Sequence, residues 1–323
     1  MLLGNQAAIA TLTEAVAGGA LHHAWLLAGP EGVGKGSIAR LAALRMLAQA
    51  DDPHGLAPGL DVPPEHRATR LFHAGSHPDY RELVRLPKDP DKPDEALARS
   101  ITIAQVRTLP AMFATKPALS PRRVVVIDAV DDLERGGANA LLKNLEEPPS
   151  GTIFLLVSHA PGRLLPTIRS RCRLLRFDPL PDAMVASVLR VERPDASAAE
   201  IDALVRAGQG SPGRALGFAG LDLGAIESDL IAIAQDGDRA NLVRSRLAKL
   251  LGVKAAQPRY EAFLERAPSF IAEAARTRSG RPLREALDAY AAARELAGAA
   301  TGLSLDAGAT VFEMSGLVAR LAG

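Results

Sequence analysis

The chain has 323 residues, of which 47% are hydrophobic; this is enough apolar material for two or three folded domains and excludes a disordered chain. Its 38 lysines and arginines nearly balance 37 acidic residues, so the net charge of +1 excludes a global attraction to nucleic acid or to a membrane. Cys172 is the single cysteine, which excludes an internal disulfide and a cysteine zinc site. Together with an N-terminus unlike a secretory leader, it predicts a cytoplasmic protein with no membrane contact.

The first half of the chain alternates short apolar runs with helical stretches, a pattern that predicts an α/β fold with a parallel sheet. Two stretches rich in Pro, Gly or His, 51–78 and 87–95, predict long loops or an insertion. Strands are expected at 24–28, 80–86, 124–128, 153–158 and 174–177, and helices at 6–17, 35–48, 101–115 and 138–147.

From about Pro181 the strand pattern disappears and amphipathic helices continue to the end of the chain. The predicted division is an α/β domain at 1–180, a small helical domain at 181–221 and an all-α bundle at 222–323. Breaks between the helices are expected at Gly208–Gly213, Asp236–Asp238, Pro258, Gly280–Pro282 and Leu303–Ser304.

A glycine-rich turn between the first predicted strand and the following helix is typical of a phosphate-binding P-loop. Gly29, Gly32 and Gly34 would let backbone amides surround phosphate oxygens at a helix N-terminus, and Lys35 would reach the outer phosphates. The alternative is a glycine-rich strand-to-helix turn without a ligand. The usual Ser or Thr hydroxyl that coordinates Mg²⁺ is replaced by Gly36, which weighs against magnesium binding.

The second element expected of a P-loop protein, an apolar strand that ends in Asp, follows downstream of the loop. The apolar run 124–127 ends in Asp128, which could hold Mg²⁺ directly or through water. The next residue is Ala129, which can neither orient water nor accept its proton. Asp131 and Asp132 are interpreted as charges at the N-terminus of a helix. The sequence therefore predicts a nucleotide site with absent or weak ATPase activity.

Five arginines lie between positions 163 and 176, immediately after the strand predicted at 153–158. A solvated basic loop is the simple interpretation. The P-loop upstream suggests a second one, in which a guanidinium crosses a subunit boundary and stabilises the charge on a transferring γ-phosphoryl group.

The segments 138–149, 154–157 and 167–172 resemble the AAA+ subunits of bacterial DNA polymerase III clamp loaders. Ser170-Arg171-Cys172 is similar to the motif that carries the trans-acting arginine finger of this family, and the resemblance implies that Arg171 is the finger. His77-Pro78-Asp79 and Gly210–Arg214 also match, and Arg214 falls at the place of a sensor-2 arginine. The resemblance covers the α/β domain and the small helical domain at 181–221, which would be the family's lid. More loosely it covers the C-terminal bundle, which would be the collar that forms oligomers.

Within that family, the gamma/tau class hydrolyses ATP, whereas the delta-prime class commonly has a defective nucleotide site and keeps the finger. Gly36, Ala129 and the intact triplet around Arg171 match the second profile. The resemblance implies a non-motor subunit of a DNA polymerase III holoenzyme, with gamma/tau and delta subunits as partners and with the sliding clamp and primer-template DNA reached through the assembly.

Two alternatives to this function remain open from the sequence. One is a catalytically active gamma/tau-type ATPase, and the other is a different AAA+ DNA motor such as a branch-migration helicase subunit. The sequence also leaves open whether the loop binds ATP or ADP weakly without hydrolysis.

Two further clusters have competing interpretations. His54, His66, His73 and His77 replace a zinc module found in other family members, but their spacing lacks the close pairs of a metal site, so no resident metal is expected. The basic segment 239–254 could contact DNA phosphates, although an ordinary solvated helix face is the favoured interpretation.

Overall fold

The structure is a computed structural model that describes residues 4–18, 21–53, 55–89, 91, 97–303 and 305–322. The chain forms two compact units. The first contains residues 1–188 together with 210–213, and the second contains residues 189–209 and 214–323. The division of the chain into three domains at 180 and 221 stays a prediction.

A five-stranded parallel sheet forms the centre of the first unit, with the strand order β2-β3-β4-β1-β5. The central strands are nearly continuous apolar runs because helices cover both faces of the sheet. The strands are β1 (Ala24–Ala28), β2 (Tyr80–Val84), β3 (Arg123–Asp128), β4 (Thr152–Ser158) and β5 (Arg173–Arg176).

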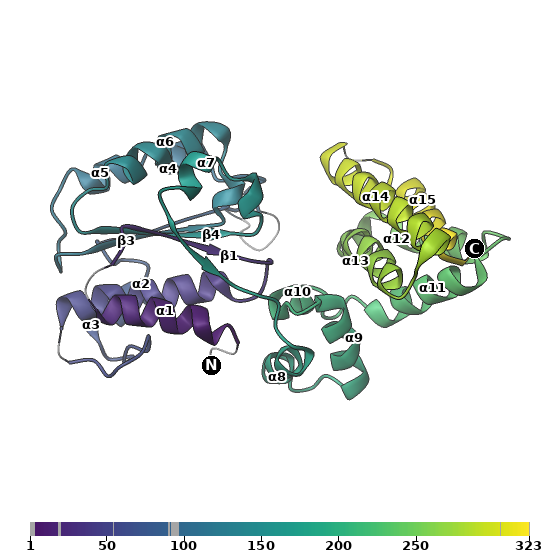
Figure 1. Ribbon diagram of the computed structural model, residues 1–323, viewed down its shortest axis with the longest axis horizontal. Helices are drawn as coiled ribbons and strands as arrows, with labels where there is room; N and C mark the ends of the chain where they lie inside the picture. Colours follow the sequence, from purple (N-terminus) through teal and green to yellow (C-terminus); the bar gives the residue numbers. More distant parts are fainter. Residues whose placement is uncertain are drawn as a thin grey trace. The chain divides into compact units, whose positions relative to one another are not determined.

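Helices lie on both faces of this sheet, as Figure 1 shows. Trp25 and Leu27 of β1 point to one core, and Leu26 and Ala28 point to the other, because successive side chains of a strand alternate. One face carries α1 (Gln6–Ala17), α2 (Lys35–Asp51) and α3 (Arg67–His73); the other carries α4 (Ile103–Val106), α5 (Leu109–Phe113), α6 (Arg135–Glu146) and α7 (Pro166–Arg169), with the short 3₁₀ helices η1 (Val130–Asp132) and η2 (Pro161–Arg163) following β3 and β4.

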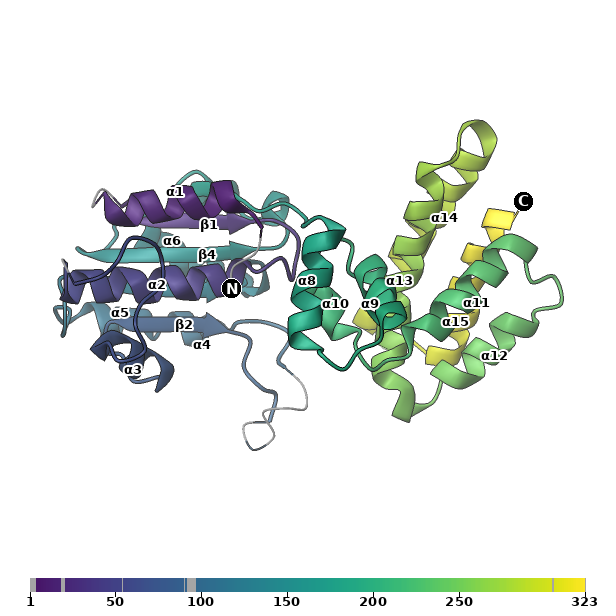
Figure 2. The same cartoon turned by 90° about the horizontal axis from the view of Figure 1, so that it is seen from below.

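Beyond β5 all regular structure in the described residues is helical, as predicted (Figure 2). In the second unit α13 packs along α14, and α12 packs against α15. None of the helices within the described ranges combines the length and apolarity needed to cross a membrane. The helices are α8 (Asp182–Glu192), α9 (Ala198–Gly208), α10 (Pro212–Gly217), α11 (Leu223–Asp236), α12 (Leu242–Leu251), η3 (Lys254–Ala256), α13 (Gln257–Arg276), α14 (Gly280–Leu303), α15 (Ala307–Ala319) and η4 (Arg320–Ala322).

The predicted fold class, an α/β domain with a parallel sheet followed by helices, is confirmed. All five strands form within two residues of the expected bounds. The single helix expected at 101–115 is wrong: it is divided into α4 and α5, because Pro110 has no amide hydrogen to continue the helix from Val106. The loop expected at 51–78 contains α3, which His66 caps by accepting a hydrogen bond from the amide of Ala68.

Parts of three predictions lie outside the described residues. They are His54 in the histidine cluster, positions 90 and 92–95 in the second loop stretch, and Ser304 in the last helix break.

Candidate functional site

The predicted phosphate loop joins β1 to α2, and its glycines have backbone geometry that other residues rarely adopt. Gly32 and Gly34 have φ angles of +76° and +96°, in the left-handed region. A Cβ atom on Gly29 would lie 2.1 Å from the carbonyl oxygen of Phe177. The loop therefore brings the first amides of α2, which have no partner within the helix, to the end of the sheet where a phosphate would bind.

Lys35 turns back onto this loop. Its Nζ donates to the carbonyl oxygen of Gly29 at 2.7 Å and also to the carbonyl of Pro30. Burial lowers the pKa of Lys35 to about 8, although the charges of Asp128 and Glu31 oppose this shift. Two of the three N–H donors of this ammonium group are therefore used by carbonyl oxygens of the loop.

The residues around Asp128 do not fit the coordination that a P-loop enzyme gives to Mg²⁺. Asp128 Oδ2 accepts from Arg40 Nη2 at 3.2 Å, and the same guanidinium donates from Nε to Glu82 Oε1 at 2.7 Å. A Cβ on Gly36 would lie 2.2 Å from Asp128 Oδ2, so the hydroxyl side chain that usually holds the metal has no space in this arrangement.

Asp131 and Asp132, shortly after Ala129, lie in the first turn of η1 and also bind other segments. Asp131 accepts from Ser158 Oγ at 3.0 Å and from the amides of His159 and Ala160, so it fixes the backbone after β4. Asp132 pairs with Arg85 Nε at 3.1 Å. Burial raises the pKa of Asp132. The interpretation of this pair as charges at a helix N-terminus is confirmed, since both lie in the first turn of η1. The carboxylate of Asp131 in addition binds amides of a different segment.

Arg171 follows α7 and is held against α6. Its Nη2 lies 2.7 Å from Glu146 Oε1, and its Nη1 donates to the carbonyl of Thr167 at 2.9 Å. The side chain remains one-third exposed. The guanidinium is therefore oriented by a carboxylate and a carbonyl while part of it still faces solvent.

The loop that precedes Arg214 contacts the phosphate loop inside the first unit. Ser211 Oγ donates to the carbonyl of Glu31 at 2.7 Å, and the amide of Gly213 donates to the carbonyl of Gly32 at 2.9 Å. The side chain of Arg214 belongs to the second unit, where it donates to Ser269 Oγ at 3.2 Å and pairs with Glu265. Its role as a sensor stays a prediction.

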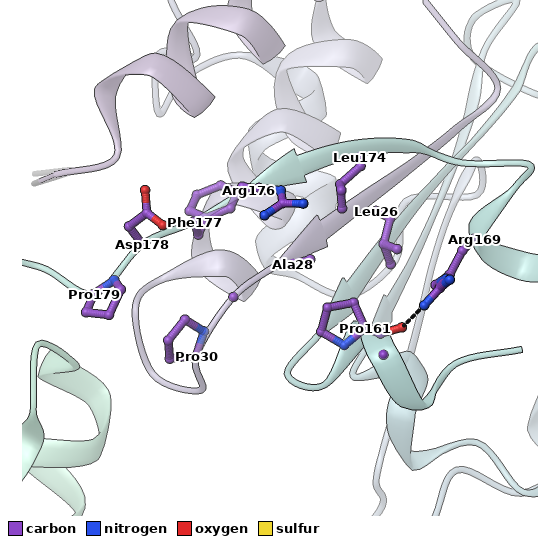
Figure 3. Close-up of a pocket in the computed structure, with 12 residues that line it drawn as sticks. Leu26, Ala28, Pro30, Pro161, Arg169, Leu174, Arg176, Phe177, Asp178 and Pro179 are labelled. Carbon is purple, nitrogen blue, oxygen red and sulfur yellow. Dashed lines mark hydrogen bonds between the residues drawn. The ribbon is translucent and has the colours of Figure 1, made fainter. Parts of the chain in front are cut away.

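Sequence reasoning missed a cavity of about 570 Å³ beside the phosphate loop (Figure 3). Gly29 and Pro30 form part of its wall, and the side chains of Arg169 and Arg176 enter the lining from α7 and β5. Arg169 Nη1 donates to the carbonyl of Pro161 at 3.3 Å, the bond drawn in Figure 3. The clustering of arginines at 163–176 was the available signal, and two of the five, Arg169 and Arg176, line this cavity.

The histidine and basic clusters have structural partners in the described residues. His77 Nδ1 accepts from the amide of Asp79, and no group of three or more His, Cys, Asp or Glu residues in the described ranges is arranged to hold a metal. In the basic segment, Arg244 pairs with Asp238 at 3.4 Å and Arg246 pairs with Asp229.

Comparison with known proteins relates the chain to subunits of DNA polymerase III. A family model described as DNA polymerase III, delta subunit, matches residues 4–181. The DNA polymerase III subunit delta' of Pseudomonas aeruginosa is 39% identical over 192 residues, 59% of this chain and 53% of that protein. The Escherichia coli subunit delta' is 34% identical over 195 residues, 60% of this chain and 54% of its own length.

A more distant relative has a longer match. The DNA polymerase III subunit gamma/tau of Mycobacterium bovis is 30% identical over 256 residues, which cover 78% of this chain and 40% of that protein. The chain spans about half the length of the two delta' relatives and less of the gamma/tau protein.

Proposed function

Because the chain belongs to the family described as DNA polymerase III, delta subunit, we propose that it is a delta-prime-type clamp-loader subunit whose Arg171 acts on a neighbouring subunit's ATP. Its partners are gamma/tau and delta subunits, and the assembly places a sliding clamp on primer-template DNA. The observation that carries the proposal is an intact, partly exposed Arg171 in a chain that has Gly36 in place of the metal-binding hydroxyl and Ala129 in place of the base.

The chemistry of Arg171 is charge stabilisation in trans. A guanidinium placed against a transferring γ-phosphoryl group accelerates hydrolysis by about 10³–10⁵-fold in GTPase examples. Glu146 Oε1 and the carbonyl of Thr167 pre-orient the guanidinium. In the assembly, phosphate oxygens would replace or share the contact with Glu146, and the fork geometry of arginine suits either partner.

We expect little or no ATP turnover at the chain's own phosphate loop. Ala129 has no group to accept a proton from water, and Asp131 is engaged by the backbone after β4. Weak binding of ATP or ADP by the loop is compatible with this function, since Gly32 and Gly34 retain the turn geometry.

The test replaces Arg171 with alanine in a reconstituted clamp loader. We expect single-turnover hydrolysis at the adjacent gamma/tau site to slow by about 10³-fold or more, and clamp loading to fall with it. Arg163→Ala is the matched control, because Arg163 is an exposed arginine of the same segment. Unchanged hydrolysis and loading with Arg171→Ala would contradict the proposal.

The second candidate is an active gamma/tau-type ATPase, which the retained Lys35 and Asp128 and the gamma/tau relative favour. Steady-state ATP turnover by the purified chain distinguishes the two. Turnover that disappears with Lys35→Ala would favour the ATPase, whereas its absence favours the non-motor subunit.

A further inference from the structure

The space beside Lys35 where P-loop proteins hold a metal is already filled by side chains of this chain. Gly36 occupies the position of the usual metal-binding Ser or Thr. A Cβ built there would meet Asp128 Oδ2 at 2.2 Å and Arg40 Nη1 at 3.2 Å. Because Gly36 has no side chain, Asp128 Oδ2 and Arg40 Nη1 can lie where a side chain at position 36 would otherwise be.

Arg40 brings a fixed positive charge to this space from the first turns of α2. Its guanidinium bridges two carboxylates on neighbouring strands, Asp128 of β3 and Glu82 of β2. Tyr80 holds the second oxygen of Glu82 through its hydroxyl, at 3.1 Å. Burial lowers the pKa of Arg40, but the nearby charges of Glu82 and Asp128 outweigh this effect and the pKa is raised overall.

From this geometry we infer that Arg40 replaces the divalent cation of the P-loop, and that any nucleotide held by this loop is bound without a metal. Mg²⁺ requires near-octahedral oxygen ligands at about 2.0–2.1 Å. A metal on Asp128 Oδ2 would lie beside Arg40 Nη2 and would have to displace it, which would break the bridge that the guanidinium makes between Asp128 and Glu82. This inference concerns the chain's own loop and holds or fails independently of Arg171.

The alternative is that Arg40 only ties α2 to the sheet, with the metal site still usable. The two interpretations predict different responses to Mg²⁺. If Arg40 were purely structural, Mg²⁺ would still strengthen nucleotide binding by the wild-type loop. If Arg40 replaces the metal, Mg²⁺ has no effect on that affinity. Removing Arg40 and supplying the hydroxyl at position 36 should then create the metal response.

The experiment is a titration of the full chain with a fluorescent ADP analogue, in Mg²⁺ and in EDTA. We expect Mg²⁺ to leave the wild-type signal unchanged, whether or not the analogue binds. Gly36→Thr/Arg40→Ala should show affinity that Mg²⁺ strengthens about tenfold or more. Gly36→Thr/Arg40→Lys is the matched control, which keeps a cation and should stay indifferent to Mg²⁺. Fluorescence of Trp25 and far-UV circular dichroism check that each variant is folded.

Two results would overturn the inference. One is wild-type affinity that Mg²⁺ strengthens tenfold; the other is a folded Gly36→Thr/Arg40→Ala variant that does not respond to Mg²⁺. If threonine at position 36 prevents folding, Arg40→Ala alone is measured with Mn²⁺ by electron paramagnetic resonance. More bound Mn²⁺ than in the wild type supports the inference, and equal binding contradicts it.

Discussion

Lys35 is 2% exposed, and its ammonium group donates to carbonyl oxygens of its own loop. The sequence predicts that this lysine lies at the start of a helix beside the loop, and the structure places it there. Its partners could not be predicted, because whether Nζ faces a ligand or the carbonyl of Gly29 depends on how closely the loop folds around it. The same holds for Arg40, whose importance comes from Glu82 on another strand.

The lowered pKa of Lys35 has a consequence for stability. The folded pKa is about 8 and the ordinary value is 10.5, so the native state binds fewer protons than the unfolded state between these values. Stability therefore rises with pH across this window. The free energy of unfolding of the wild type relative to Lys35→Met should rise by up to about 3 kcal/mol from pH 8 to 10.5.

Urea unfolding followed by Trp25 fluorescence at several pH values measures this difference. Lys116→Met removes an exposed lysine and controls for the loss of one positive charge. A wild-type minus Lys35→Met difference that stays flat or falls across the window would show that the ammonium group is not destabilised by burial.

Among the elements, α13 shows what amphipathic periodicity predicts and what it does not. The pattern predicts a helix after position 258 but not that Arg266 is buried on its inner face, 1% exposed. There the guanidinium binds Glu227 of α11 at 2.7 Å and Glu273 of α13 at 2.9 Å. A buried charge of this kind is tolerated only with such partners, and one of them is 39 positions away in the chain.

Removing this guanidinium should destabilise the helical unit. Arg266→Met leaves two carboxylates facing each other without a cation, and we expect a loss of about 3–5 kcal/mol in the free energy of unfolding. Chemical denaturation followed by far-UV circular dichroism measures it. Arg281→Met breaks an exposed pair with Glu285 and should leave the free energy of unfolding unchanged within experimental error. Equal effects of the two substitutions would contradict the buried role of Arg266.

At the scale of the whole molecule, the proposed function requires other subunits. If the chain supplies Arg171 to the ATP site of another subunit, as proposed, we expect it not to form a closed ring with copies of itself. Such a ring would place each Arg171 against a neighbour's loop that lacks both the hydroxyl at position 36 and the base at position 129.

The purified chain should therefore have the mass of one copy, 33.9 kDa, at working concentrations. Adding a gamma/tau subunit should produce a larger mixed complex. Native mass spectrometry or light scattering measures both. A closed homomeric ring would instead favour a different AAA+ motor, and failure to join gamma/tau would oppose the clamp-loader assignment.

The sequence by itself determined the parallel α/β fold, the loop at 29–35, the positions of all five strands and the Ser170-Arg171-Cys172 triplet. Each of these is a local pattern of apolar periodicity, glycine spacing or adjacent residue types. Only the tertiary structure decided which side chains lie beside that loop where P-loop proteins hold a metal. Arg40 is separated from Glu82 by 42 positions and from Asp128 by 88, and such a contact depends on which strands the sheet places side by side.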